Sequence, residues 1–82
     1  LAYFPDAIME IARVSMIGNE QHNKGQKLHW AREKSTDQLD CAVRHIIDHH
    51  KNPVDTDTGL HLAKAAWRLM AELQLWLETQ NG

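Results

Sequence analysis

The fold is decided by a long apolar stretch near the C-terminus, residues 60–79, which reads LHLAKAAWRLMAELQLWLET. Apolar residues cover most of the circumference at helical spacing, so the sequence predicts one helix about 30 Å long. A single polar stripe interrupts them, made of His61, Lys64, Arg68 and Glu72. Because charges recur every three or four residues, this helix is not expected to span a membrane.

Two further helices are predicted upstream. Residues 5–17 are almost continuously apolar, and the Gly-Asn pair that follows favours a helix stop. Residues 35–52 carry an apolar stripe at helical spacing, and Ser35 with Gln38 fits a capping box at its start. Residues 20–34 have no sustained period and are expected to form a long ordered loop.

Three such helices cannot enclose the apolar surface that they carry. We therefore expect an all-α fold: a small helical bundle of three main helices, in one domain spanning residues 1–82, completed as a homodimer or homotetramer. The net charge of −2 argues against a nucleic-acid partner. The single Cys41 makes no internal disulfide, and no leader is recognised. A cytoplasmic location is expected, in the host if a phage encodes the protein.

Acidic residues on the first two helices are candidate metal ligands. Glu10 lies in an apolar helix, where a carboxylate needs an ion pair, for which Arg13 is available, or a metal. Asp37 and Asp40, three residues apart, project from one side of the second helix and suit Mg²⁺ or Mn²⁺. The alternative is that they favour the positive end of the helix dipole.

Histidines supply a second pattern with metal-compatible spacing. His45, Asp48 and His49 follow an i, i+3, i+4 arrangement on the second helix. An alternative is that histidines near a helix C-terminus are favoured there by the dipole. Residues 55–59 look like half of a calcium loop but lack its remaining ligands, so an EF-hand is rejected.

Cationic residues could bind phosphate. His61, Lys64 and Arg68 share one face of the last helix, with Arg44 available from the helix before it. Donors focused on one face suit phosphate oxygens, although a solvated polar stripe is the alternative. Trp30 is a candidate for stacking on a base, or else a plug for the core.

These pieces together resemble a known family. The motifs are EIARV at residues 10–14, Gly18, HWAR at residues 29–32, DCAVRH at residues 40–45 and DTDTGLHLAKA at residues 55–65. In this order and spacing they are similar to the small phage dATP/dGTP diphosphohydrolase-type domain. That domain is grouped with the MazG-like all-α nucleoside triphosphate pyrophosphohydrolases.

The resemblance implies a metal site and a reaction. MazG-like enzymes hold Mg²⁺ or Mn²⁺ with an ExxE pair on one helix and an ExxD pair on the next. Here Glu10 matches the first acid, Arg13 stands where its partner is expected, and Asp37 with Asp40 matches the second pair. Asp48 and Glu20 are possible substitute ligands, both outside the family's positions. Water would then attack a purine deoxynucleoside triphosphate, releasing pyrophosphate and a nucleoside monophosphate.

The same resemblance assigns expected roles to other residues. Arg44, Lys64 and Arg68 would stabilise the leaving pyrophosphate. Trp30 would contact the base. Supporting roles fall to three residues, His45, His61 and Asp57. Two alternatives stay open: a nucleotide-binding domain that does not cleave, and a helical interaction module of a phage.

Overall fold

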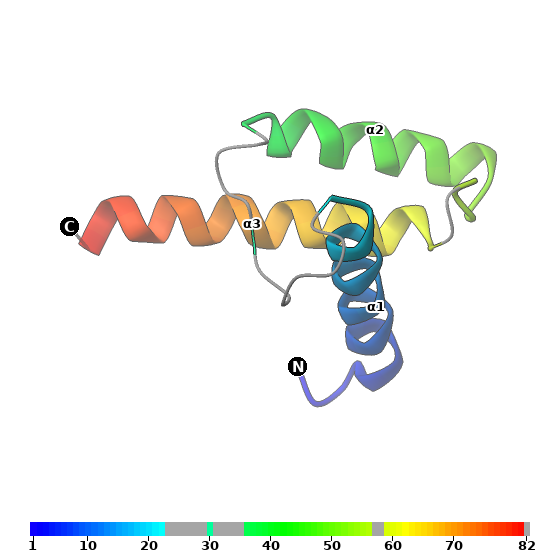
Figure 1. Ribbon diagram of the computed structural model, residues 1–82, viewed down its shortest axis with the longest axis horizontal. Coiled ribbons are helices and arrows are strands. Elements are labelled where there is room, and N and C mark those ends of the chain that lie inside the picture. Colours follow the sequence, from blue (N-terminus) through cyan, green and yellow to red (C-terminus); the bar gives the residue numbers. More distant parts are fainter. Residues whose placement is uncertain (23–29, 31–35, 57–58, 82) are drawn as a thin grey trace.

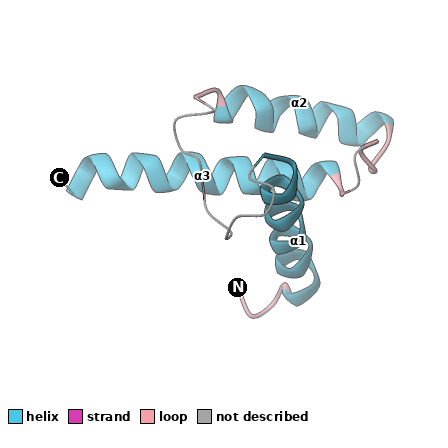
Figure 2. Cartoon of the chain, in the orientation of Figure 1, coloured by secondary structure: helices cyan, strands magenta, loops and turns pink. Residues whose placement is uncertain are grey.

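The computed structural model describes residues 1–22, 30, 36–56 and 59–81, and this part of the chain is all helix and connecting loop (Figures 1 and 2). Its helices are α1 (Pro5–His22), α2 (Gln38–Lys51) and α3 (His61–Asn81). Within these described residues the only β-pairing is an isolated antiparallel bridge between Val54 and Leu60. The predicted all-α fold is therefore confirmed.

Helix α3 is the element against which the other two helices pack. Helix α2 lies alongside α3 and runs in the opposite direction, while α1 crosses α3 (Figure 1). In the described part of the chain, α1 and α2 each pack against α3 but do not pack against each other. The C-terminal end of α3 extends beyond both partners (Figure 1). No described helix combines the length and apolar character that crossing a bilayer requires.

The helix boundaries differ from two sequence expectations. Helix α1 continues through Gly18 to His22, so the predicted stop at that glycine is wrong. Asn19 is 8% exposed, so packing around this residue overrides a weak local stop signal. Helix α2 begins at Gln38 with Asp37 as its N-cap, without a capping side-chain hydrogen bond. Ser35, the proposed capping partner, lies outside the described residues.

The buried centre is small and partly polar. Its apolar members are short side chains: Cys41, Ala42, Ala63, Ala65 and Ala71. These small residues let the backbones of α2 and α3 approach closely. Within the described part of the chain, the largest fully buried side chain is polar and belongs to Gln38 of α2.

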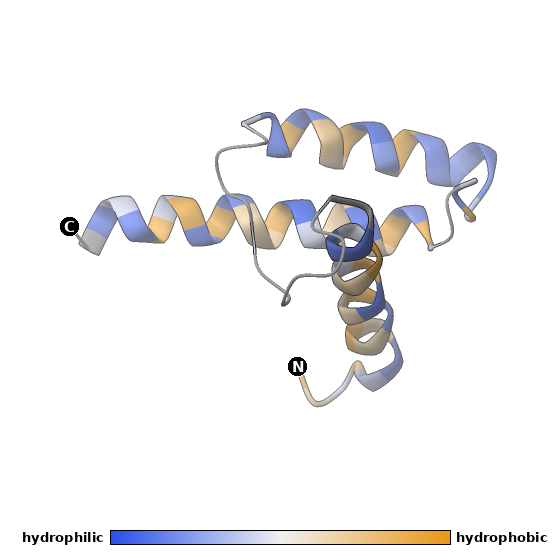
Figure 3. Ribbon diagram, viewed as in Figure 1, coloured by the Kyte–Doolittle hydropathy of each residue, from blue (hydrophilic) through white to orange (hydrophobic). Residues whose placement is uncertain are grey.

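Large apolar side chains lie instead on the outside of the single chain. Leu69, Met70, Leu73 and Trp76 of α3 are all exposed, Leu73 and Trp76 to 57% each. The apolar stretches along α1 and the C-terminal part of α3 are visible in Figure 3. In one chain the polar stripe of α3 packs inward, with His61 buried and Lys64 and Arg68 half-buried, whereas much of the apolar surface of this helix stays exposed.

Candidate functional site

The loop between α2 and α3 folds back on itself and fixes one carboxylate beside the start of α3. The backbone N–H of Asp55 donates to the carbonyl of Gly59 at 3.0 Å, and the N–H of His61 donates to the carbonyl of Pro53 at 3.0 Å. Gly59 has φ of +106°, a conformation that residues with a Cβ rarely adopt. The turn therefore depends on glycine at this position.

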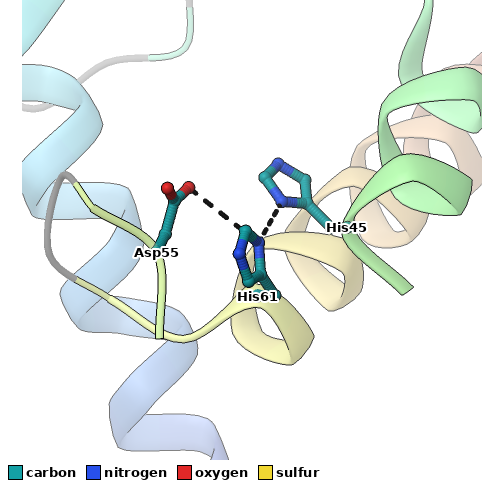
Figure 4. Close-up of side chains that lie close together, drawn as sticks. All are labelled: His45, Asp55 and His61. Atoms are coloured by element: carbon teal, nitrogen blue, oxygen red, sulfur yellow. Dashed lines mark hydrogen bonds and ion pairs between the residues drawn. The ribbon is translucent and has the colours of Figure 1, made fainter. Parts of the chain in front are cut away.

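This turn brings together three side chains from three segments of the chain, shown in Figure 4. His45 of α2 and His61 at the start of α3 face each other, with their Nδ1 atoms 2.9 Å apart. Oδ2 of Asp55 lies 3.9 Å from Nδ1 of His61. Lys64, one turn further along α3, donates from Nζ to the same Oδ2 at 2.7 Å. Together, His45, Asp55, His61 and Lys64 form a linked cluster, which we call the His–Asp–Lys cluster.

Electrostatics set the charge states within the His–Asp–Lys cluster. The hydrogen bond from Lys64 lowers the pKa of Asp55 to about 2, against an opposing effect of partial burial. The N–H of Thr56 also donates to this carboxylate. Burial is the main cause that lowers the pKa of His45, helped by the neighbouring His61 and Lys64. At neutral pH the cluster therefore holds an ionised carboxylate and a neutral His45 imidazole.

One turn beyond Lys64, a second polar contact joins the two helices. Gln38, 1% exposed, is the largest fully buried side chain among the described residues, and its Oε1 accepts a hydrogen bond from Nη1 of Arg68 at 3.0 Å. The Arg68 guanidinium also lies 5.7 Å from the centre of the Trp67 ring. Trp67 in turn meets Trp30 edge to face, with ring centres 6.0 Å apart. Arg68 and Trp30, predicted as ligand contacts, thus belong to one packed group.

A shallow open depression on α2 contains three of the predicted residues. It is lined by Asp37, Asp40, Val43 and Arg44. Nη2 of Arg44 lies 3.6 Å from Oδ2 of Asp37 and donates to Sγ of Cys41 at 2.9 Å. The spacing prediction that Asp37 and Asp40 share one side of the helix agrees with this arrangement.

The remaining predicted acids are not gathered at that depression. Glu10 of α1 pairs with Arg13, with Oε2 and Nη1 3.7 Å apart, which is the ion pair considered as the alternative. Since α1 and α2 do not pack together in the described part of one chain, Glu10 is not brought to Asp37 and Asp40 there. Asp48 is half-buried further along α2.

The comparisons with known proteins bear on the whole chain. A family model described as dATP/dGTP diphosphohydrolase, N-terminal, matches residues 1–82. The chain belongs to this family. Searches of curated proteins and of solved structures gave no match. The resemblance inferred from the motifs is thus confirmed, and the match is to an N-terminal domain.

In this dATP/dGTP diphosphohydrolase N-terminal domain, sequence reasoning missed one member of the cluster. The sequence places Asp55 in a rejected calcium-loop pattern and in a family-like motif without a site role, whereas the structure places it against His61 and Lys64. The sequence signal that could have identified Asp55 is the glycine turn at Gly59, just before His61 begins α3. Asp57, the neighbouring acid with an expected supporting role, lies outside the described residues.

The dATP/dGTP diphosphohydrolase N-terminal domain also pairs its histidines differently from the sequence pattern. His45 contacts His61 of α3, which is 16 residues away, rather than the i+3 and i+4 side chains of its own helix. Nδ1 of His49 is buried and has no hydrogen-bond partner among the described residues. A tertiary contact, which helix periodicity alone does not reveal, decides the partner of His45.

Proposed function

We propose that this domain takes part in the metal-dependent hydrolysis of purine deoxynucleoside triphosphates to a nucleoside monophosphate and pyrophosphate. The observation that carries the proposal is the family match over the full 82 residues. The paired carboxylates on α2 and the cations that line the contact of α2 with α3 support it, because triphosphate hydrolysis needs both.

The metal ligands in this proposal are Asp37 and Asp40, completed by Glu10 and by Asp48 of a second copy, because Asp48 lies about 12 Å along α2 from Asp40 of the same chain. Carboxylate oxygens are suitable ligands for Mg²⁺ or Mn²⁺, and the depression beside Asp37 and Asp40 is open to solvent. When bound, the ion would neutralise triphosphate charge and activate the attacking water. Because α1 does not pack on α2 in one chain, Glu10 would be contributed by a second copy.

The phosphate contacts are assigned to Arg44, Lys64 and Arg68. Arg44 lies at the edge of the depression, where it already holds a carboxylate. Lys64 and Arg68 would exchange their present acceptors, Asp55 and Gln38, for phosphate oxygens. A bound triphosphate therefore has to compete with these internal hydrogen bonds.

The remaining predicted residues have roles around these contacts. Trp30, held against Trp67, would contact the base. Support for the ligand-binding groups is assigned to His45, His61 and Asp57. A half-buried and a buried imidazole, hydrogen-bonded to each other, are suited to holding neighbouring side chains in one orientation.

Self-association is the second part of the proposal, as a homodimer or homotetramer. Its support is the run of large apolar side chains that one chain leaves exposed on α3, including Leu69, Met70, Leu73 and Trp76. Contiguous exposed apolar surface of this kind usually marks an interface. Pairing through α3 would cover that surface.

A nucleotide screen tests the activity. The full chain is incubated with each common nucleoside triphosphate in Mn²⁺ or Mg²⁺, and pyrophosphate and phosphate are measured separately. We expect pyrophosphate from dATP or dGTP, and its loss in Asp40→Asn but not in the control Asp6→Asn, which alters an exposed acid of α1. Release of phosphate alone, or equal activity in both variants, would contradict the proposal.

One observation favours a second candidate, a domain that binds the nucleotide without cleaving it. Arg13 replaces an acid expected from the family pattern, and it neutralises the remaining Glu10 in an ion pair. Calorimetry separates the two candidates. Saturable dATP or dGTP binding with no pyrophosphate release at any metal concentration would establish the binding module.

A further inference from the structure

The His–Asp–Lys cluster contains a donor set unlike that of the carboxylate depression. His45, Asp55 and His61 each offer one ligand atom, and these atoms all lie within 4.8 Å of one another. They come from α2, the connecting loop and the first residue of α3, respectively (Figure 4). One ion bound by all three would tie these segments together.

The geometry is close to that of a tetrahedral metal site. Metal–nitrogen distances of about 2.0–2.1 Å place two tetrahedral ligand atoms about 3.3 Å apart. The two Nδ1 atoms are 2.9 Å apart, and Oδ2 of Asp55 is 3.9 Å from that of His61. The imidazoles would separate slightly and the carboxylate would move inward by about half an ångström or more to reach that spacing.

The ligand chemistry separates this site from a magnesium site. Two imidazoles and one carboxylate favour a borderline transition metal, whereas Mg²⁺ prefers oxygen ligands and bound water. We propose that His45, Asp55 and His61 bind one divalent transition-metal ion of the zinc type. Three protein ligands leave the fourth position for water or another small oxygen ligand. This site does not depend on the proposed hydrolysis.

The surroundings hold the three ligands in place. The side chain of His61 is 10% exposed and that of Asp55 is 21% exposed. Oδ1 of Asp55 accepts a hydrogen bond from the N–H of Thr56 at 2.7 Å, which orients the carboxylate. Such outer hydrogen bonds commonly orient metal ligands.

The positive charge of Lys64 disfavours a bound cation, which gives the proposal a specific test. Its ammonium group occupies Oδ2 of Asp55 and places a positive charge beside the site. In the metal-bound protein, this carboxylate oxygen would be shared between the ion and Lys64. Removing the lysine should therefore strengthen metal binding even though it removes an ion pair.

Cobalt and zinc titrations of the full, chelator-treated chain test the site. Co²⁺ should bind one ion per chain with the visible absorption of a tetrahedral or five-coordinate nitrogen–oxygen site, and Zn²⁺ but not Mg²⁺ should displace it. His45→Gln and Asp55→Asn should each weaken Co²⁺ binding by more than about tenfold, because losing even an outer partner of a ligand costs about 10- to 100-fold. The control is His50→Gln, an exposed histidine on the same helix.

Circular dichroism checks the helicity of each variant. Should Asp55→Asn fail to fold, His45→Gln still decides, because His45 is only half-buried. Lys64→Met should bind Co²⁺ more tightly than the parent. The proposal is overturned if the parent gives no such absorption with excess Co²⁺, or if His45→Gln binds as tightly as His50→Gln. The histidines would then be a hydrogen-bonded pair only.

Discussion

Replacing Lys64 with methionine tests how far the polar interior of this domain stabilises it. Methionine keeps most of the side-chain length but loses the ammonium group that donates to Asp55 at 2.7 Å. The pKa of Asp55, lowered from 3.8 to about 2, corresponds to roughly 2 kcal/mol of stabilisation at about 1.4 kcal/mol per unit. The two side chains are 17% and 21% exposed, so solvent screening reduces the expected loss to about 1–2 kcal/mol.

Thermal unfolding of metal-free protein measures this loss. Domains of this size change melting temperature by about 4–8 °C per kcal/mol, so Lys64→Met should melt about 5–15 °C below the parent at pH 7. Parent and variant are compared at equal chain concentration. The matched control is Lys51→Met, which removes an exposed lysine at the end of α2 and should change little.

The stabilisation that Lys64 gives through Asp55 should depend on pH in a defined direction. Because the pKa of Asp55 is lowered by folding, its contribution is present above the unfolded pKa of 3.8 and is lost as pH falls toward about 2. The difference between parent and Lys64→Met should thus be full at pH 7 and shrink below pH 4. Equal melting temperatures at pH 7 would refute the reasoning, and would restore the simpler view of Lys64 as a solvated residue.

Three further predictions, the last of them a pair of glycine substitutions, concern other parts of the fold. Leu73→Glu should keep its helicity but lose self-association in light scattering, with Leu73→Met as control, and a parent that is monomeric at micromolar concentration would contradict this. Asp40→Asn should lose most of the rise in melting temperature that Mn²⁺ gives the parent, and an unchanged response would exclude Asp40 as a ligand. Gly59→Ala should lose about 1–3 kcal/mol because its φ is +106°. Gly18→Ala, with nothing within 4 Å of an added Cβ, should gain about 0.5–1 kcal/mol, and equal effects at the two glycines would refute the strain argument.

The sequence predicts the three helices because their apolar residues recur at helical spacing. It also predicts that Asp37 and Asp40 share a side of α2, since this depends only on positions within one helix. It fails at Gly18, where packing around Asn19 carries α1 past a local stop signal. Residue spacing predicts which side chains share a face of one helix, but it does not predict which other elements that face contacts.

The candidate site shows the same limit. The contact between His45 and His61 joins residues 16 apart, and the neighbouring Asp55 reaches them only through a folded-back loop. The sequence also does not predict which face of α3 packs inward. Lys64 and Arg68 point inward because the loop and α2 supply hydrogen-bond acceptors for them. A polar stripe on a helix can face solvent or a hydrogen-bonding neighbour, and periodicity does not distinguish the two.

Among the described helices, α1 is attached to α3 but not to α2, and this has a consequence for how the domain opens. Most of the described α1 side chains are exposed, and α2 with α3 forms a separate, more extensive contact. Helix α1 can therefore detach as a sub-global unit while the α2–α3 hairpin stays intact, and its amides should exchange with deuterium at a lower opening free energy. Glu10 travels with the detaching helix, whereas the histidine pair remains with the hairpin.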